Sequence, residues 1–193
     1  HGVIFAKDAW NLTHQEGSPP SAPLEEESEW HSFRHEVRTA FGSGTMLQEL
    51  YLTPMLLSEE NWDDLAVAAS WAKSAADVMV DAHWVGGDPH KLQPYGWAAW
   101  QDECIDKTAQ KPCAGAARAV LTLRNPSSRK QSLELDAAEV FELPAHARQR
   151  HLELRTPFLD QPMVLLELTP GYAKSIHLDP FEVLVFDTAA PAI

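Results

Sequence analysis

The sequence is poor in cysteine, in basic residues and in long apolar runs. Its 193 residues contain two cysteines, and 15 Lys and Arg stand against 28 Asp and Glu, which gives a net charge of −13. An acidic balance of this size disfavours binding to a phosphate backbone and to an anionic membrane surface. Every apolar run stays short of the roughly 18 residues that a membrane span needs. We therefore expect neither nucleic acid nor a membrane as a partner.

Apolar residues, in contrast, are plentiful. Hydrophobic residues make up 45% of the chain and charged residues 22%, which is the balance of a folded globular protein. The length suits one domain or two small ones. The residue pattern changes at Gly86-Gly87-Asp88-Pro89, which we interpret as a turn. The sequence therefore predicts an α/β part over residues 1–88 and an antiparallel β-sandwich over residues 89–193.

The α/β part shows two strand–helix pairs. Apolar runs predict strands at Gly2–Ala6 and Thr45–Leu52, and apolar positions three and four apart predict a helix over Trp30–Phe41. A second helix is expected over Ser58–Ala76, with Ser58 as its N-cap. Residues 14–29, rich in proline, serine and glutamate, are expected to form an exposed loop. This order is typical of a βα-repeat fold, and two repeats cannot close a sheet without further strands.

The second part alternates with a period of two. Turn residues such as Asn125-Pro126 separate short strands of similar length. The predicted strands are Tyr95–Trp100, Ala117–Arg124, Gln131–Asp136, Glu139–Leu143, Arg150–Arg155, Met163–Leu168, Ala173–Leu178 and Phe181–Asp187. About eight short strands at regular spacing, with few helices between them, predict an antiparallel sandwich.

Several long segments resemble one group of glycoside hydrolases, related to the α-galactosidases and α-N-acetylgalactosaminidases, some of whose members carry an enterotoxin label. The segments are Gly44-Thr45-Met46-Leu47-Gln48-Glu49-Leu50-Tyr51-Leu52-Thr53-Pro54, Asp81-Ala82-His83-Trp84-Val85-Gly86-Gly87-Asp88-Pro89 and Tyr95-Gly96-Trp97-Ala98-Ala99-Trp100, together with Trp62 and Trp71. Leu121–Ser127 and Leu178–Leu184 resemble the C-terminal sandwich of that group. The resemblance runs from about Phe33 onward, and these motifs contain no catalytic signature.

The resemblance implies a (β/α)8 barrel followed by an antiparallel sandwich of about eight strands. Gly2–Ala6 and Thr45–Leu52 would then be the last two barrel strands, and this chain lacks counterparts of the six earlier ones. The family is expected to use two carboxylates that flank the glycosidic bond, both on earlier strands. We therefore predict that this chain is a fragment, the C-terminal part of a glycoside hydrolase, and that it contains no catalytic residue. Its expected partners are a carbohydrate substrate in the complete barrel and the remainder of the parent chain.

Three residues near the end of the second predicted strand are candidates for substrate binding. Active sites of such barrels lie at the C-terminal ends of the strands, which points to Glu49, Tyr51 and Thr53. Glu49 can accept a hydrogen bond from a sugar hydroxyl, and Tyr51 can stack on a sugar ring. The alternatives are a buried, paired carboxylate for Glu49 and core packing for Tyr51.

Four residues near the junction of the two parts are predicted to form an interface or to be structural. His83 and Trp84 follow Asp81, and a His–Asp pair can either fix a domain interface or tune a proton transfer. Trp97 and Trp100 point to opposite faces of an extended strand, so one belongs to the core. The other packs on the barrel or stacks on a sugar.

Two remaining motifs concern cysteine and histidine. Cys104 and Cys113 bracket a polar loop, which predicts a disulfide and a periplasmic or secreted protein, with two free thiols in a cytosolic chain as the alternative. His31 and His35 lie four residues apart without an H-E-x-x-H pattern, which favours a solvated helix face over a zinc site. Neither a metal nor another cofactor is predicted.

A second function from a different class also fits the pattern. The chain can be a stand-alone, non-catalytic sandwich that binds carbohydrate or a protein partner. Tryptophan-dependent sugar binding by the sandwich would favour this module over a structural support for a barrel.

Overall fold

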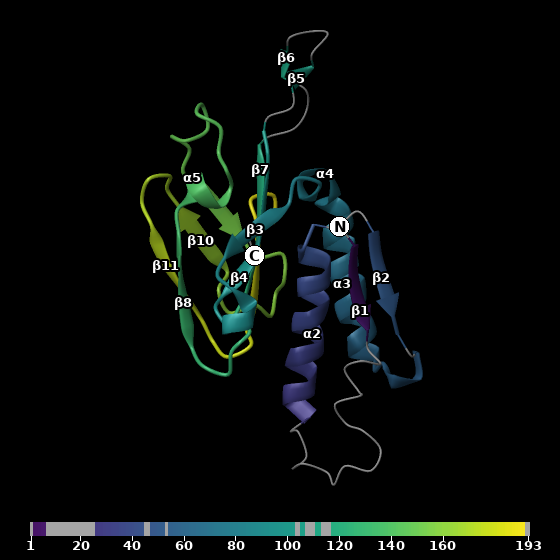
Figure 1. Ribbon diagram of the computed structural model, residues 1–193. Coiled ribbons are helices and arrows are strands. Elements are labelled where there is room, and N and C mark those ends of the chain that lie inside the picture. The colour runs from purple at the N-terminus through teal and green to yellow at the C-terminus, as the bar shows by residue number, and fades with distance from the viewer. Residues whose placement is uncertain are drawn as a thin grey trace.

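A computed structural model describes residues 2–6, 26–44, 47–52, 54–102, 105–106, 111–112 and 117–191. Figure 1 shows the elements side by side in successive layers. A small two-stranded sheet (β8 and β11) lies next to the main sheet, which is followed by helices α2 and α3 and then by the parallel pair β1 and β2.

The first two strands and the helix between them form a βαβ unit. β1 (Gly2–Ala6) pairs in parallel with β2 (Leu47–Tyr51), and α2 (Glu26–Gly42) connects the two. A helical crossover is the usual way to join parallel neighbours, so the predicted strand–helix–strand order is confirmed. The exposed loop predicted up to residue 29 is wrong over 26–29, because α2 already begins at Glu26.

The second helical segment begins where the sequence predicts. α3 (Glu59–Ser74) starts with a capping box: the Ser58 hydroxyl accepts a hydrogen bond from the Asn61 N–H at 3.2 Å. The Asn61 side chain in turn accepts one from the Ser58 N–H at 3.3 Å. The short helix α4 (Ala76–Met79) follows. Within the described ranges, we find no helix long and apolar enough to span a membrane.

Eight strands in two sheets confirm the predicted antiparallel sandwich. The main sheet has the order β10-β9-β12-β7-β4-β3, and the second sheet pairs β11 with β8. The strands are β3 (His83–Gly86), β4 (Tyr95–Gln101), β7 (Arg118–Arg124), β8 (Gln131–Leu135), β9 (Leu152–Arg155), β10 (Leu165–Leu168), β11 (Lys174–Leu178) and β12 (Val183–Asp187). Shorter elements are the turns η2 (Pro54–Leu56) and η3 (Pro89–Lys91), the hairpin strands β5 (Ile105–Asp106) and β6 (Lys111–Pro112), and the helix α5 (Ala137–Val140).

The structure corrects the predicted strand at Glu139–Leu143. This stretch instead contains α5, and the Asp136 carboxylate caps it by accepting a hydrogen bond from the Ala138 N–H at 2.7 Å. Val140, Phe141 and Leu143 are buried in the core. A single helical turn therefore buries the apolar residues whose near-alternation suggested a strand.

The structure also adds a strand that we did not predict. β3 pairs antiparallel with β4 at the edge of the main sheet, although it precedes the boundary predicted between residues 88 and 89. The division into two domains remains a prediction. Cys104, Cys113 and the disulfide predicted between them lie outside the described residues.

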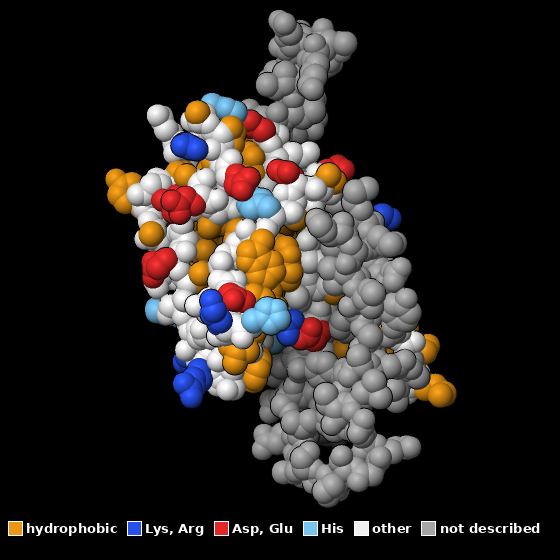
Figure 2. Space-filling model, viewed as in Figure 1, with side chains coloured by type: hydrophobic (Ala, Val, Ile, Leu, Met, Phe, Trp, Pro, Cys, Tyr) orange, Lys and Arg blue, Asp and Glu red, His pale blue; other side chains and the backbone are white. Residues whose placement is uncertain are grey.

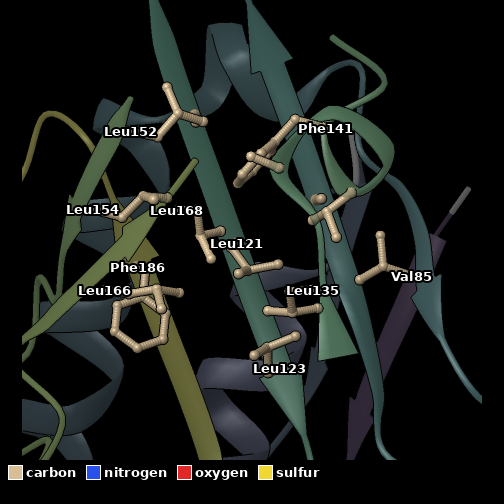
Figure 3. Close-up of a cluster of buried hydrophobic side chains, with 14 of the residues drawn as sticks. Val85, Leu121, Leu123, Leu135, Phe141, Leu152, Leu154, Leu166, Leu168 and Phe186 are labelled. Carbon is tan, nitrogen blue, oxygen red and sulfur yellow. The ribbon is translucent and has the colours of Figure 1, made fainter. Parts of the chain in front are cut away.

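Two buried cores flank the main sheet. The larger fills the space between the main sheet and the β8–β11 sheet, where strand side chains such as Leu121, Leu135 and Phe186 pack together (Figure 3). The smaller lies on the other face, where Val120 and Val185 pack with residues of α2 and α3. The main sheet is therefore covered on both faces, and the sandwich and the helices form one packed body.

The two segments that resemble a glycoside hydrolase sandwich are neighbours in space. β7 and β12 pair antiparallel, with Val183 opposite Arg124. The next residue, Asn125, is fully buried, and its side-chain amide donates to the backbone oxygens of Asp179 and Arg129 at 2.8 Å each. The predicted turn at Asn125-Pro126 is thus fixed by hydrogen bonds between these two segments.

Candidate functional site

The residues predicted to bind substrate belong to the C-terminal end of the parallel pair. The register places Glu49 opposite Ile4 and Tyr51 opposite Ala6, so the carboxyl ends of both strands lie at the same edge. Sites of βα-repeat enzymes are built at this edge. Thr53 lies outside the described residues. The roles of these three residues in substrate binding therefore remain predictions.

A buried carboxylate joins the sandwich to α3. The side chain of Asp187 on β12 is 1% exposed and accepts hydrogen bonds from Arg118 Nε at 2.9 Å and from Trp71 Nε1 at 3.0 Å. Arg118 also donates to the backbone oxygen of Ser74 at 2.6 Å, at the end of α3. Because the carboxylate has both a charged and a neutral donor, its burial is compensated.

A second ionic network joins both helices to the loop between β9 and β10. Arg34 on α2 donates to Asp64 on α3 at 2.7 Å and to Asp160 at 3.1 Å. Arg38 donates to Asp160 at 2.5 Å, and its guanidinium lies 4.2 Å from the ring centre of Phe158. Burial raises the pKa of Asp64. Burial also acts to raise the pKa of Asp160, but its hydrogen bond and charge interaction with Arg38 outweigh this and hold that pKa below its ordinary value.

The Asp160 contacts predict an acid-dependent loss of stability. Because the folded pKa lies below the ordinary 3.8, the carboxylate stabilises the fold above that pH and ceases to do so as the pH falls through its folded value. The variant Asp160→Asn should therefore have a lower urea midpoint than the wild type at pH 7. The two midpoints should converge once the pH falls below the folded pKa of Asp160, where both side chains are neutral. A difference that stays constant across this range would contradict the assignment.

A third contact holds α2 against the sheet. Arg124 on β7 forms a bidentate ion pair with Glu36 and also donates to the Thr39 hydroxyl at 3.2 Å. In all three networks, the carboxylates pair with arginines across elements distant in sequence. This arrangement positions the helices on the sandwich and does not resemble a pair of carboxylates placed across a substrate bond.

Three aromatic rings gather on the outer two strands of the main sheet. Trp84 on β3 stacks on Tyr95 of β4, with ring centres 4.7 Å apart and planes 7° from parallel. Trp97 lies directly opposite Trp84 in the register and meets both rings edge-on, at 5.5 and 5.6 Å. Figure 2 shows hydrophobic side chains gathered over β3 and β4 on this face. We call these three residues the aromatic cluster.

The other residues predicted for this junction are structural in their contacts. Trp100 is buried in the large core, on the face opposite to Trp97, as the alternation predicts. His83 Nε2 donates to the backbone oxygen of Val140 at 2.8 Å and so fastens β3 to α5. Its contact with Asp81 is to the backbone oxygen, at 3.3 Å. Tyr95 was missed by sequence reasoning, although its position two residues before Trp97 predicts a shared face.

The two histidines weighed as a metal pair, His31 and His35, both lie on α2. Among the residues that the structure describes, no group of three or more His, Cys, Asp or Glu side chains is arranged to hold a metal ion.

Comparison with known proteins yields matches in structure alone. No protein-family model and no curated protein matches the sequence. A candidate α-N-acetylgalactosaminidase from Bacillus halodurans matches with a TM-score of 0.54 and 13% identity over 80% of this chain and 31% of its own. The α-galactosidase I of Mortierella vinacea has a TM-score of 0.50 and 10% identity over 86% of this chain and 37% of its own. AmyP, crystallised with maltotriose, has a TM-score of 0.55 and 10% identity over 99% of this chain and 41% of its own.

These similarities establish the fold. The neighbours are glycoside hydrolases of the α-galactosidase, α-N-acetylgalactosaminidase and α-amylase types, in agreement with the resemblance in the sequence. At 10–13% identity they identify neither a substrate nor a reaction for this chain. The chain spans 31–41% of the length of these three solved structures.

Proposed function

We propose that this chain is the C-terminal portion of an α-galactosidase-like glycoside hydrolase. The observation that carries the proposal is the continuous order of a parallel βαβ unit, two helical segments and an eight-strand sandwich, joined by the buried Asp187 contacts. The similarity to glycoside hydrolases extends over 80–99% of the chain, across both of its parts. This breadth supports a role for the whole chain rather than for the sandwich alone.

In the proposed complete protein, β1 and β2 are the last two strands of a (β/α)8 barrel. The two catalytic carboxylates, one a nucleophile or base and the other an acid, lie on strands that precede this chain. Glu49, Tyr51 and Thr53 at the carboxyl edge of β2 then form one wall of the substrate pocket, where Glu49 accepts a hydrogen bond from a sugar hydroxyl. The sandwich supports the barrel through α2 and α3, and the substrate is an α-linked sugar of the galactose type.

The proposal is tested by hydrolysis of a panel of chromogenic substrates. The panel contains α-galactoside, α-N-acetylgalactosaminide and α-glucoside, and the enzyme is the longer natural protein that contains this sequence. We expect hydrolysis of the α-galactoside by the longer protein and none by the 193-residue chain, which serves as the matched control. Absence of hydrolysis across the panel, or equal hydrolysis by the short chain, would contradict the proposal.

A further inference from the structure

One face of the main sheet is covered by helices only part of the way across. The helices α2 and α3 pack on this face at Val120 of β7 and Val185 of β12. Ala99 of β4 belongs to the same buried core, and Trp97, two residues earlier on that strand, points to the same face. Trp84 of β3 lies opposite Trp97 in the register. The aromatic cluster therefore continues the covered face toward the edge strand β3, where Trp84 is 47% exposed.

The two helices follow the strands of this face in a definite order. α3 lies on the side of β12 and β9, because Trp71 donates to Asp187 of β12 and meets the ring of Phe158, just after β9, edge-on at 5.6 Å. α2 lies over β7, because a Cβ atom at Gly42 would be 2.3 Å from the Thr122 hydroxyl oxygen. Along the strand order β9-β12-β7-β4-β3, the face therefore carries α3, then α2, then the aromatic cluster.

The two flanks of α2 have the same order. Residues two apart on a helix point to nearly opposite sides. On one flank, Arg34 donates to Asp64 of α3 at 2.7 Å. On the other flank, Glu36 pairs with Arg124 of β7, whose register partner on β4 is Tyr95. A helix packed against this second flank of α2 therefore lies over β4 and β3.

Chain order identifies that helix in the proposed complete protein. The helices of a (β/α)8 barrel form an outer ring, and consecutive elements are usually neighbours. α3 follows α2 in the chain and lies on one side of it, so the other side belongs to the helix that precedes β1. α2 meets the main sheet with apolar side chains such as Val37 and Phe41. The preceding helix should present an outward apolar stripe of the same kind.

We propose that the aromatic cluster is one side of a buried interface with the helix that precedes β1 in the complete protein. The inference rests on the proposed function, because only a longer barrel supplies this helix. Trp84 stacks on Tyr95, and Trp97 meets both rings edge-on, so the cluster offers an ordered apolar surface. At its border, Arg124 and Glu36 are paired with each other, so their charges are matched when the interface forms. The sandwich thus holds three successive barrel helices.

The test is hydroxyl-radical footprinting of the 193-residue chain and of the longer natural protein, with oxidation measured at single side chains by mass spectrometry. We expect Trp84 to be oxidised at least about fivefold more slowly in the longer protein, because the core of an interface excludes water. Tyr172 is the matched control. It is 74% exposed in the turn after β10, the opposite edge strand of the main sheet, and should react equally in both proteins.

A charge placed on the cluster provides a second measurement. Trp84→Lys should lower the apparent melting temperature of the longer protein by more than that of the 193-residue chain, since only the longer protein buries the ammonium group. Tyr172→Lys should leave both melting temperatures unchanged. Equal losses from Trp84→Lys in the two proteins would contradict the interface. Should this variant fail to fold, footprinting of the two wild-type proteins still decides.

The outcomes separate the interface from the proposed hydrolase function. Slow Trp84 oxidation in a longer protein that hydrolyses no substrate of the panel would support the interface and contradict the hydrolase. Hydrolysis together with equal Trp84 oxidation in both proteins would overturn the interface alone. Equally slow oxidation in the short chain would indicate a second copy on the cluster, and oxidation slowed only by added sugar would indicate a ligand. Either result would overturn the inference, and a natural protein no longer than this chain would contradict both proposals.

Discussion

Replacing Asp187 by alanine is expected to cost the fold about 3–5 kcal/mol, because it leaves the charge of Arg118 without its partner in a largely buried position. The Asp187 side chain is 1% exposed and that of Arg118 19% exposed. The same change removes the acceptor of the Trp71 indole N–H. Asp187→Asn retains a neutral acceptor and should therefore be less destabilising than the alanine variant.

The measurement is urea unfolding followed by tryptophan fluorescence and far-UV circular dichroism. Asp179→Ala is the control, because Asp179 forms an ion pair with Lys130 that is exposed on both sides, and we expect no measurable change in its midpoint. Similar midpoints for Asp187→Ala and Asp179→Ala would show that the buried network does not hold the sandwich to α3.

Gly96→Ala is expected to be comparably severe, through a steric clash in the main sheet. A Cβ atom at residue 96 would lie 1.9 Å from the backbone oxygen of Thr122 and 2.9 Å from its carbonyl carbon. Both atoms belong to β7, which pairs with β4 along seven residues. Since backbone atoms cannot move aside as a side chain does, we expect a loss of at least about 3 kcal/mol and a weakened β4–β7 pairing.

Gly171→Ala separates this clash from the general cost of losing a glycine. Gly171 has a φ of +82°, and a Cβ atom there would meet nothing within 4 Å. The cost should be about 1 kcal/mol, from the left-handed backbone alone. Urea midpoints of the two variants provide the comparison, with amide exchange of β4 and β7 as a local measurement. Equal midpoints, or unchanged exchange in Gly96→Ala, would contradict the clash.

Local patterns in the sequence predict most of the elements. The strands of the sandwich alternate because one face of each packs in a core, and the apolar spacing of α2 reflects its packing against the main sheet. Ser58 marks the start of α3 because the local capping geometry is independent of the rest of the fold. Each of these features is determined by residues close together in the sequence, so the local pattern is sufficient to predict it.

Features that depend on distant residues were not predictable in this way. Asp187 lies 69 residues from Arg118 and 116 from Trp71, and no local spacing indicates that the three meet. The four residues of β3 are too few for a period to be recognised, and their strand character depends on pairing with β4. The aromatic cluster was missed for the same reason, since it forms only when Trp84 and Trp97 are placed opposite each other.

For the candidate substrate residues, the sequence predicts the place in the fold but not the contact with substrate. The parallel register confirms that Glu49 and Tyr51 belong to a strand next to β1, as the βα order predicts. Whether they face a sugar depends on the strands that would complete the barrel. In the proposed complete protein, those strands determine the role of both residues, and for the same reason the proposal assigns no catalytic residue to this chain.

The proposal that this chain is the C-terminal portion of a longer enzyme is tested most directly by the mass of the natural protein. A denaturing blot of the source cells, with an antibody raised against this chain, measures the mass of the protein that contains it. We predict a band well above 21.5 kDa, because the chain spans 31–41% of the glycoside hydrolases that it resembles in structure. A single band at 21.5 kDa would contradict the hydrolase proposal and favour a stand-alone binding module.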